Sequence, residues 1–194
     1  MSEDASAGWE AVVEAFAAAR SPVGADVVRR WSRNLPRNGA ILDIGCGTGW
    51  PIATTLAEQG FAIFAIDPAP AMLAAFRQNL PDAAAACESA EESRFFDRRF
   101  NGAIAIGLMF LLPEAAQRRI IQRVAQALHP GGRFLFSAPQ AACEWDDILT
   151  GRRSRALGAT RYHALLAAAG LKPLGSATDE GQNHYFEAMA TVPS

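Results

Sequence analysis

The stretch Ile41-Leu42-Asp43-Ile44-Gly45-Cys46-Gly47-Thr48-Gly49 decides the fold of this chain. An apolar run typical of a buried strand leads into three glycines at alternate positions, and residues 51–59 then have the pattern of a helix. The glycines therefore lie in a strand-to-helix turn, where a ligand can approach the backbone without meeting a Cβ. Asp43 is placed to fix this loop or to meet the ammonium group of a ligand. The spacing GxGxG differs from the GxGxxG that holds a pyrophosphate at a helix N-terminus.

Strand-like and helix-like segments alternate along the chain after residue 39. The strand-like segments are 40–44, 61–66, 83–87, 101–107, 133–138, 171–178 and 184–190. The helix-like segments are 51–59, 70–79, 114–128 and one that starts near Thr160. Because the central strands are apolar on both faces, this pattern predicts an α/β fold, a Rossmann-like three-layer sandwich with a mostly parallel seven-stranded sheet. The polar turn 179–183 predicts a closing hairpin, so the last strand is expected to be antiparallel.

Two more helices are predicted ahead of the first strand. The apolar face of the first, over residues 8–20, consists of Trp9, Val12, Val13 and Phe16. Ser21 followed by Pro22 is typical of a helix start, with Ser21 as the N-cap of the second helix. At 194 residues the chain is expected to form a single domain. Its expected parts are an N-terminal helical cap (1–36), a core (37–138) and a final loop, helix and closing hairpin (139–194).

Composition is that of an ordinary globular protein. Half of the residues are hydrophobic, 20% are charged, and the net charge is −2. Nothing in this balance predicts a nucleic-acid or membrane partner. The basic run 151–155 is interpreted as a solvated loop rather than as a phosphate site. The longest apolar run, 103–112, is too short to cross a bilayer.

The three cysteines are far apart and have no metal-ligand spacing, so no metal site is expected. An odd number of cysteines without paired spacing fits the reducing cytoplasm. The acidic start Met1-Ser2-Glu3-Asp4 does not resemble a secretory signal peptide, which would begin with a cationic and then an apolar region. We therefore expect a cytoplasmic protein.

The predicted strands direct several informative positions to one edge of the sheet. Asp67 ends the second strand, twenty-two residues after Gly45, where a carboxylate suits the two hydroxyls of a ribose. The alternative is that Asp67 only caps the helix 70–79. The glycine loop, Asp67, the 88–92 region and the 107–110 region all follow strands, and ligands bind in such sheets beyond the carboxyl ends of the strands. Together they predict a site for an adenosine-containing cofactor.

The ordered motifs of this chain resemble those of class I S-adenosylmethionine (SAM)-dependent methyltransferases. The motifs are Asp43-x-Gly45-x-Gly47-x-Gly49, Asp67, Ser89-Ala90-Glu91, the segment 100–105 and Pro130-Gly131-Gly132. More narrowly, the chain resembles bacterial small-molecule methyltransferases of the ubiquinone- and menaquinone-biosynthesis type. The grounds for this narrower resemblance are Thr48 within the glycine loop, the segment 108–112 and the tail 179–185.

The resemblance implies roles for individual residues. Gly45 and Gly47 would face the methionine part of SAM, and Asp67 would hold the ribose. Ala90 and Glu91 would border the adenine, and Gly107 with Leu108 would form the floor near the methyl group. The complete set of expected cofactor residues is Arg20, Asp43, Gly45, Cys46, Gly47, Gly49, Asp67, Pro68, Met72, Ser89, Ala90, Glu91, Gly107 and Leu108. Two positions depart from the family pattern, which usually has Asp where this chain has Ser89 and Asn101.

The expected reaction is an in-line transfer of the SAM methyl group to a small-molecule acceptor, which leaves S-adenosylhomocysteine. A hydroxyl acceptor would be helped by a base, for which His163 and His184 are the candidates, with surface or turn positions as the alternatives. Arg20 could meet the methionine carboxylate. Phe110, Trp145 and Tyr162 are the expected substrate residues; the alternative for Phe110 and Trp145 is a place in the core.

Three other functions compete with this one. An NAD-dependent oxidoreductase would be expected to carry GxGxxG, which is missing here. A non-catalytic methyltransferase-like binding protein would lack an acceptor site. A DNA amino-group methyltransferase would be expected to carry an Asn/Asp-Pro-Pro-Tyr tetrapeptide, where this chain has Gly107-Leu108-Met109-Phe110. The expected partner is a small molecule, with no nucleic acid or membrane, and the protein is expected to be a monomer or a homodimer.

Overall fold

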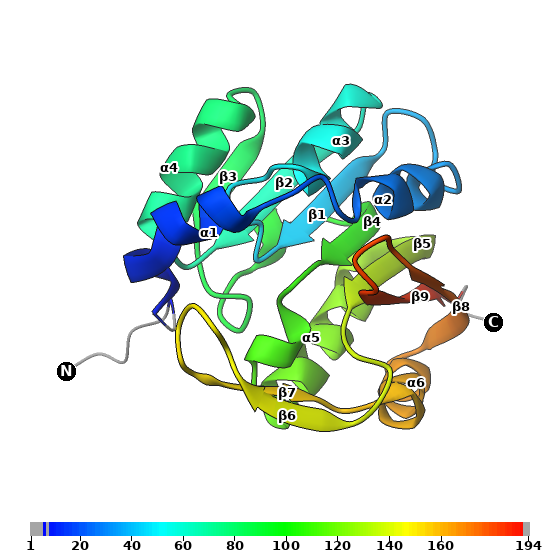
Figure 1. Cartoon of the computed structure of the whole chain (residues 1–194). Coiled ribbons are helices and arrows are strands. Elements are labelled where there is room, and N and C mark those ends of the chain that lie inside the picture. Colours follow the sequence, from blue (N-terminus) through cyan, green and yellow to red (C-terminus); the bar gives the residue numbers. More distant parts are fainter. Residues whose placement is uncertain (1–5, 7, 192–194) are drawn as a thin grey trace.

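A computed structural model of the chain describes residue 6 and residues 8–191; the acidic start Met1–Asp4 lies outside the described residues. The main sheet is formed by β1 (Ala40–Ile44), β2 (Ala62–Asp67), β3 (Ala84–Cys87), β4 (Phe100–Ala105), β5 (Leu128–Ser137), β8 (Leu171–Thr178) and β9 (His184–Ala190). Its strand order is β3-β2-β1-β4-β5-β9-β8 (Figure 1). Only β9 runs against its neighbours, which confirms the mostly parallel seven-stranded sheet with an antiparallel last strand.

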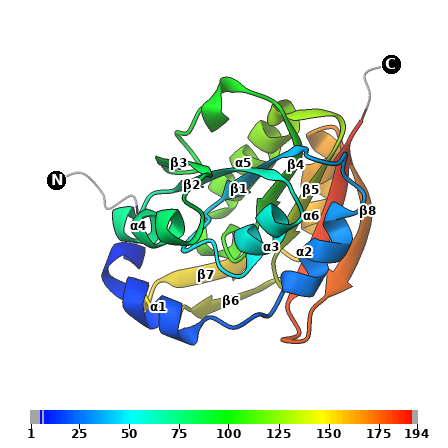
Figure 2. The ribbon, with the colours of Figure 1, turned by 90° about the horizontal axis from the view of Figure 1, so that it is seen from above.

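Helices cover both faces of this sheet (Figures 1 and 2). The helices of one face are α2 (Ala25–Ser32), α3 (Ile52–Glu58) and α4 (Pro70–Asn79), and those of the other are α5 (Glu114–Ala127) and α6 (Ala159–Ala168). Alternation along the strands explains the two cores: in β1, Ile41 packs with the first group and Leu42 with the second. The three-layer sandwich is therefore confirmed. None of the described helices is long and apolar enough to cross a membrane.

The N-terminal segment contains a 3-10 turn, η1 (Trp9–Val12), followed by α1 (Val13–Ala19), within the predicted range 8–20. The predicted start of the next helix at Ser21 was wrong. The α2 helix begins at Ala25, and its N-cap is Gly24, whose φ of 87° lies in the left-handed region.

The turn before α2 explains this difference. The Ala25 N–H donates to the Pro22 carbonyl, so Pro22 belongs to a turn and not to the first helical position. Gly24 adopts a positive φ that favours glycine. A Cβ at Gly24 would also lie 2.5 Å from the Tyr185 hydroxyl oxygen, so glycine is required there for close packing as well.

The segment predicted as a loop before α6 instead contains a second, two-stranded sheet of β6 (Cys143–Asp146) and β7 (Arg153–Ala156). The basic run 151–155 is thus partly a strand. Arg155 lies opposite Glu144 and Arg153 opposite Asp146, and both pairs form salt bridges. Cross-strand pairing of opposite charges stabilises such a hairpin, a contact that no local pattern in the basic run reveals. The loop of the hairpin reaches the N-terminal segment, where a Cβ at Gly8 would lie 3.5 Å from Arg152 Nε.

Candidate active site

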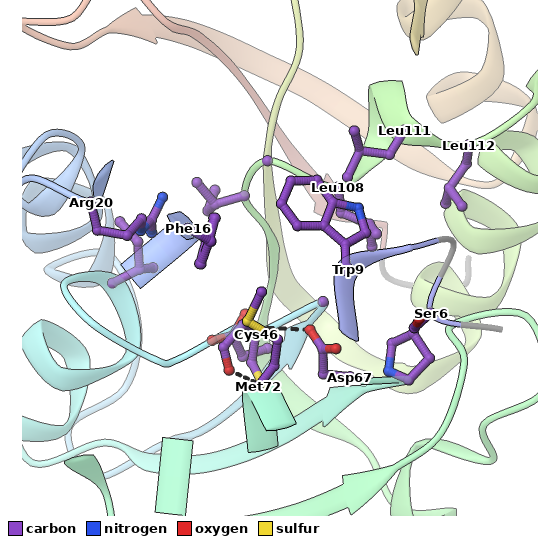
Figure 3. A pocket seen from close by; sticks show the side chains of 17 residues that line it. Ser6, Trp9, Phe16, Arg20, Cys46, Asp67, Met72, Leu108, Leu111 and Leu112 are labelled. Carbon is purple, nitrogen blue, oxygen red and sulfur yellow. Dashed lines mark hydrogen bonds between the residues drawn. The ribbon is translucent and has the colours of Figure 1, made fainter. Parts of the chain in front are cut away.

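A cavity of about 130 Å³ lies beyond the carboxyl ends of β1, β2 and β4 (Figure 3). Many residues expected to bind the cofactor line it: Arg20, Asp43, Gly45, Cys46, Gly47, Asp67, Pro68, Met72, Gly107 and Leu108. They come from loops that are distant in sequence, because parallel strands direct their carboxyl ends to the same edge. In the described part of the chain, no group of three His, Cys, Asp or Glu side chains could hold a metal ion.

Asp67 organises the glycine loop through both of its carboxylate oxygens. Its Oδ2 accepts the Gly47 N–H at 2.9 Å, and its Oδ1 accepts the Ala69 N–H at 2.9 Å. Burial raises the pKa of Asp67, while these two backbone hydrogen bonds act in the opposite direction. A carboxylate has further acceptor positions beyond these two, so Asp67 can hold the loop and still accept from a ligand.

Asp43 is buried at the end of β1, with 4% of its surface exposed. No described residue donates a hydrogen bond to its carboxylate, although the side chain borders the cavity. Burial and the negative charge of Asp67 raise the pKa of Asp43 to about 7, and the nearby Arg20 opposes this. A buried carboxylate without a hydrogen-bond donor is costly, and a positively charged ligand group would compensate for it.

Arg20 lies at the end of α1 and borders the same cavity. Its Nε donates to the Trp50 carbonyl at 3.3 Å, and its guanidinium carbon lies 5.0 Å from the centre of the Phe16 ring. Burial lowers the pKa of Arg20, whereas Asp43 and Tyr185 raise it. The guanidinium is thus held at the cavity wall by one hydrogen bond and one aromatic contact, which leaves its other donors for an anionic group.

The three glycines of the loop do not share one role. Gly45 and Gly47 line the cavity with φ of 69° and 54°. Gly49 does not line it: a Cβ at Gly49 would lie 2.7 Å from the Phe76 ring, so glycine allows α4 to pack against the loop. The expectation that Gly49 borders the cofactor cavity is therefore corrected. The loop spacing alone cannot separate a ligand contact from close packing, because both require a missing Cβ.

The N-terminal segment covers the cavity with side chains that the sequence reasoning did not assign to a site. Trp9 and Phe16 line it, and their rings meet edge to face with centroids 5.5 Å apart. Glu10 anchors the segment, because its Oε2 accepts the Ala71 N–H at the start of α4. The amphipathic pattern over residues 8–20 was the available signal, but it could not distinguish a face that packs on the core from one that closes a cavity.

The segment Ser89-Ala90-Glu91 lies outside this cavity. Ser89 lines a surface recess with Cys87 and Glu88, and Pro68 borders both this recess and the cavity. Glu91 forms a salt bridge with Arg119 of α5, and the Ala90 carbonyl accepts from Arg123. These arginines hold the segment against α5, and Ser89, Ala90 and Glu91 do not line the cavity itself.

A second cavity of about 400 Å³ adjoins the first, and Trp9, Phe16, Arg20 and Gly107 border both. Phe110 lines its wall, and the ring of Trp145 packs against Phe110 with centroids 5.3 Å apart. Trp145 therefore supports this wall from β6. Polar residues also border the cavity: Ser137 of β5, Asp147 of the turn between β6 and β7, Asn183 of the loop before β9, and Tyr185 of β9.

The two histidines proposed as bases do not border either cavity. His163 is exposed on α6, and its ring lies 5.8 Å from that of Phe186; the His184 ring lies 4.6 Å from the same phenylalanine. His184 and Tyr185 are neighbours on β9, and alternation sends them to opposite faces, with Tyr185 towards the cavity. Burial, and secondarily His163, lowers the pKa of His184.

Tyr162, expected to contact the substrate, is instead a core residue. Its ring is fully buried between Phe136 and Phe186. Its hydroxyl donates to Gln117 Oε1 at 2.8 Å and accepts the Leu157 N–H at 3.3 Å. Burial raises the pKa of Tyr162 to about 12. The buried face of α6 explains the correction, since Tyr162 lies on it with Leu165 and Leu166.

Comparison with known proteins agrees with this geometry. Residues 41–132 match the family model described as a methyltransferase domain. An uncharacterized methyltransferase of Mycobacterium tuberculosis is 37% identical over 94 residues, which cover 48% of this chain and 37% of that relative. A relative in Mycobacterium bovis matches equally well. The chain thus spans little more than a third of the length of these curated relatives.

Solved methyltransferases share the fold. A SAM-bound amino pentose methyltransferase from Micromonospora echinaspora aligns with a TM-score of 0.74 and 20% identity, over 93% of this chain and 97% of that one. A Burkholderia thailandensis 1,6-didemethyltoxoflavin-N1-methyltransferase, with 1,6-didemethyltoxoflavin and S-adenosylhomocysteine bound, aligns with a TM-score of 0.65 and 22% identity, over 98% and 80% of the two chains. Residues 41–132 therefore match a methyltransferase domain, and the chain shares the fold of these solved methyltransferases.

Proposed function

We propose that this protein is a SAM-dependent methyltransferase that transfers a methyl group to a small-molecule acceptor. One observation carries the proposal: the Asp43 carboxylate is buried without a hydrogen-bond donor from the described residues, beside the backbone of Gly45 and Gly47. A cationic ammonium group next to that carboxylate would compensate for its burial. The methyltransferase domain that matches this loop supports the same assignment.

Each residue at the cavity has a proposed part in holding SAM. Asp43 binds the ammonium group, and Arg20, with donors left over, binds the methionine carboxylate. Asp67 accepts from the ribose through acceptor positions that Gly47 and Ala69 do not use. The residues that line the cavity match the groups of SAM in this arrangement. Carboxylates face its ammonium and hydroxyl groups, and a guanidinium faces its carboxylate.

SAM supplies a methyl group that is already activated by its sulfonium. The residues of the chain then have to hold an acceptor in line with that methyl group, and such alignment supplies much of the rate enhancement. The second cavity adjoins the first at Arg20 and Gly107, so it is the proposed acceptor site. The proposed division of the chain is a cap within residues 1–36, of which residue 6 and residues 8–36 are described, a cofactor-binding core over 37–138 and an acceptor side over 139–194, of which 139–191 are described.

We further propose a cytoplasmic protein, a monomer or homodimer, with no nucleic-acid or membrane partner. Three unpaired cysteines, Cys46, Cys87 and Cys143, support a reducing compartment. The net charge of −2 supports the absence of a nucleic-acid partner. Neither histidine borders the cavities, so the proposed mechanism does not use His163 or His184 as a base.

A thermal-shift assay with SAM, S-adenosylhomocysteine and NADH tests the proposal. At 100 times its dissociation constant a ligand adds roughly 2.7 kcal/mol of stability. A chain of this size should then melt about 5–10 °C higher. We expect a shift with the two sulfur compounds and none with NADH. Asp67→Ala should abolish the shift while the protein still unfolds cooperatively, and exposed Asp82→Ala should leave it intact. A shift with NADH alone would overturn the proposal.

A further inference from the structure

The second cavity has a polar end that is formed by two neighbouring strands. Ser137 of β5 and Tyr185 of β9 are directly opposite each other in the antiparallel ladder. Both border the cavity, although they are only 5% and 2% exposed. Directly opposite residues of an antiparallel pair point to the same side of the sheet. Their hydroxyl groups therefore belong to one surface, and the hydrogen bonds that each already makes decide what that surface can offer a ligand.

The hydroxyl proton of Tyr185 already takes part in a hydrogen bond to a carboxylate. Its hydroxyl donates to Asp179 Oδ2 at 2.8 Å. Asp179 is itself buried, and the backbone N–H groups of Gly181 and Asn183 donate to its Oδ1 at 2.9 Å each. Burial raises the pKa of Tyr185, and the bond to Asp179 adds to this, so the phenol keeps its proton. With that proton directed at Asp179, the Tyr185 oxygen can act only as an acceptor towards a further partner.

Ser137 has the complementary arrangement. Its Oγ accepts the Gly107 N–H at 2.7 Å, and its own proton reaches no acceptor among the described residues. A hydroxyl that already accepts still has one proton to donate. These two strands therefore present one acceptor, the Tyr185 oxygen, and one donor, the Ser137 hydroxyl, beside other polar residues that border the cavity, among them Arg20, Asp147 and Asn183. The glycine at position 24 is part of this arrangement, because any Cβ there would press on the Tyr185 hydroxyl.

Aromatic rings also border the same cavity. The rings of Trp9, Phe16 and Phe110 border it, and Trp145 supports Phe110 from behind. Its volume of about 400 Å³ falls within the range of roughly 300–1,000 Å³ that is usual for small-molecule sites. A flat ring fits between such walls, and a polar substituent on that ring could reach the Ser137 and Tyr185 pair.

We propose that the methyl acceptor is a small ring compound with a hydroxyl or amine group that donates a hydrogen bond to the Tyr185 oxygen. Asp179 and Tyr185 together select ring compounds that carry such a donor. The proposal rests on the function proposed above. Tyr185 is the contact residue, and Asp179 is a positioning residue that fixes the direction of the Tyr185 hydrogen bond. Ser137 donates to an oxygen or nitrogen lone pair of the same compound. A ring without an O–H or N–H leaves the Tyr185 oxygen without a partner, which costs affinity.

Three probes of similar shape test this selectivity: phenol, which donates and accepts; anisole, which only accepts; and toluene, which does neither. Their dissociation constants are measured by NMR on the amide of Gly107, with S-adenosylhomocysteine at saturation. One hydrogen bond is worth about 1 kcal/mol, or about fivefold in affinity. We expect phenol to bind about fivefold more tightly than anisole. Tyr185→Phe should remove that difference. Anisole should bind more tightly than toluene because Ser137 can donate to the anisole oxygen, and Ser137→Ala should remove this second difference.

Tyr162→Phe is the matched control, because Tyr162 is also a buried tyrosine with a hydrogen-bonded hydroxyl but borders neither cavity. It should keep the preference for phenol. Asp179→Ala frees the Tyr185 hydroxyl to donate a hydrogen bond to a ligand, so the affinity for anisole should rise relative to the affinity for phenol in this variant. A purely structural role of Asp179 would weaken all probes alike.

The results separate this inference from the function on which it rests. Binding of S-adenosylhomocysteine while the three probes bind equally tightly, or while no probe binds, overturns the inference on the acceptor. Either result leaves the methyltransferase assignment in place. Retention of the phenol preference by Tyr185→Phe would also overturn the inference on the acceptor. If calorimetry shows no binding of S-adenosylhomocysteine to the unmodified protein, the proposed function itself fails. Folding of each variant is checked by its melting transition before binding is measured.

Discussion

At the scale of single residues, the buried Asp43 should make the ligand-free protein sensitive to pH. Its pKa is raised from 3.8 to about 7, so the folded state holds a proton that the unfolded state has lost between these values. The free energy of unfolding should therefore fall as pH rises from about 4 to 7. At about 1.36 kcal/mol per pH unit, the fall is at most about 4 kcal/mol. Urea unfolding at several pH values should show a flatter profile for Asp43→Asn, with exposed Asp82→Asn as the control; identical slopes would contradict the assignment.

At the scale of elements, the η1–α1 segment forms one wall of the cofactor cavity through Trp9 and Phe16. A ligand that enters this cavity changes the surroundings of the Trp9 indole. Binding of S-adenosylhomocysteine should therefore change the tryptophan emission, and Trp9→Phe should lose most of that change while it still binds. Trp31→Phe is the matched control, because Trp31 is buried on α2 and does not border the cavity. A signal that survives in Trp9→Phe and disappears in Trp31→Phe would show that the segment does not close on the ligand.

At the scale of the whole molecule, an aromatic cluster ties β5 and β9 to α6. Phe136 stacks on Phe134 and Phe186 and meets Tyr162 edge to face, each with centroids 5.1 Å apart. Phe136→Ala should cost about 3–5 kcal/mol, because it leaves a cavity where these elements meet. The melting temperature should fall by roughly 6–20 °C. Phe110→Ala, at a cavity wall, should cost clearly less, and an equal loss in both variants would contradict this reading of the core.

The sequence by itself determined the order of the seven strands of the main sheet and of the helices between them, the parallel core with its closing hairpin, and the loop Asp43–Gly49 as part of the site. These features follow from local periodicity and glycine spacing, which act over a few residues. Only the tertiary structure decided which side chains border the cavities. His184 and Tyr185 are adjacent, yet the pairing of β9 with β5 directs Tyr185 to the cavity and His184 away from it. Gly49 meets α4 rather than a ligand. Such outcomes depend on contacts between distant segments. A shift of one residue in the pairing of a strand would move every side chain of that strand to the other face of the sheet.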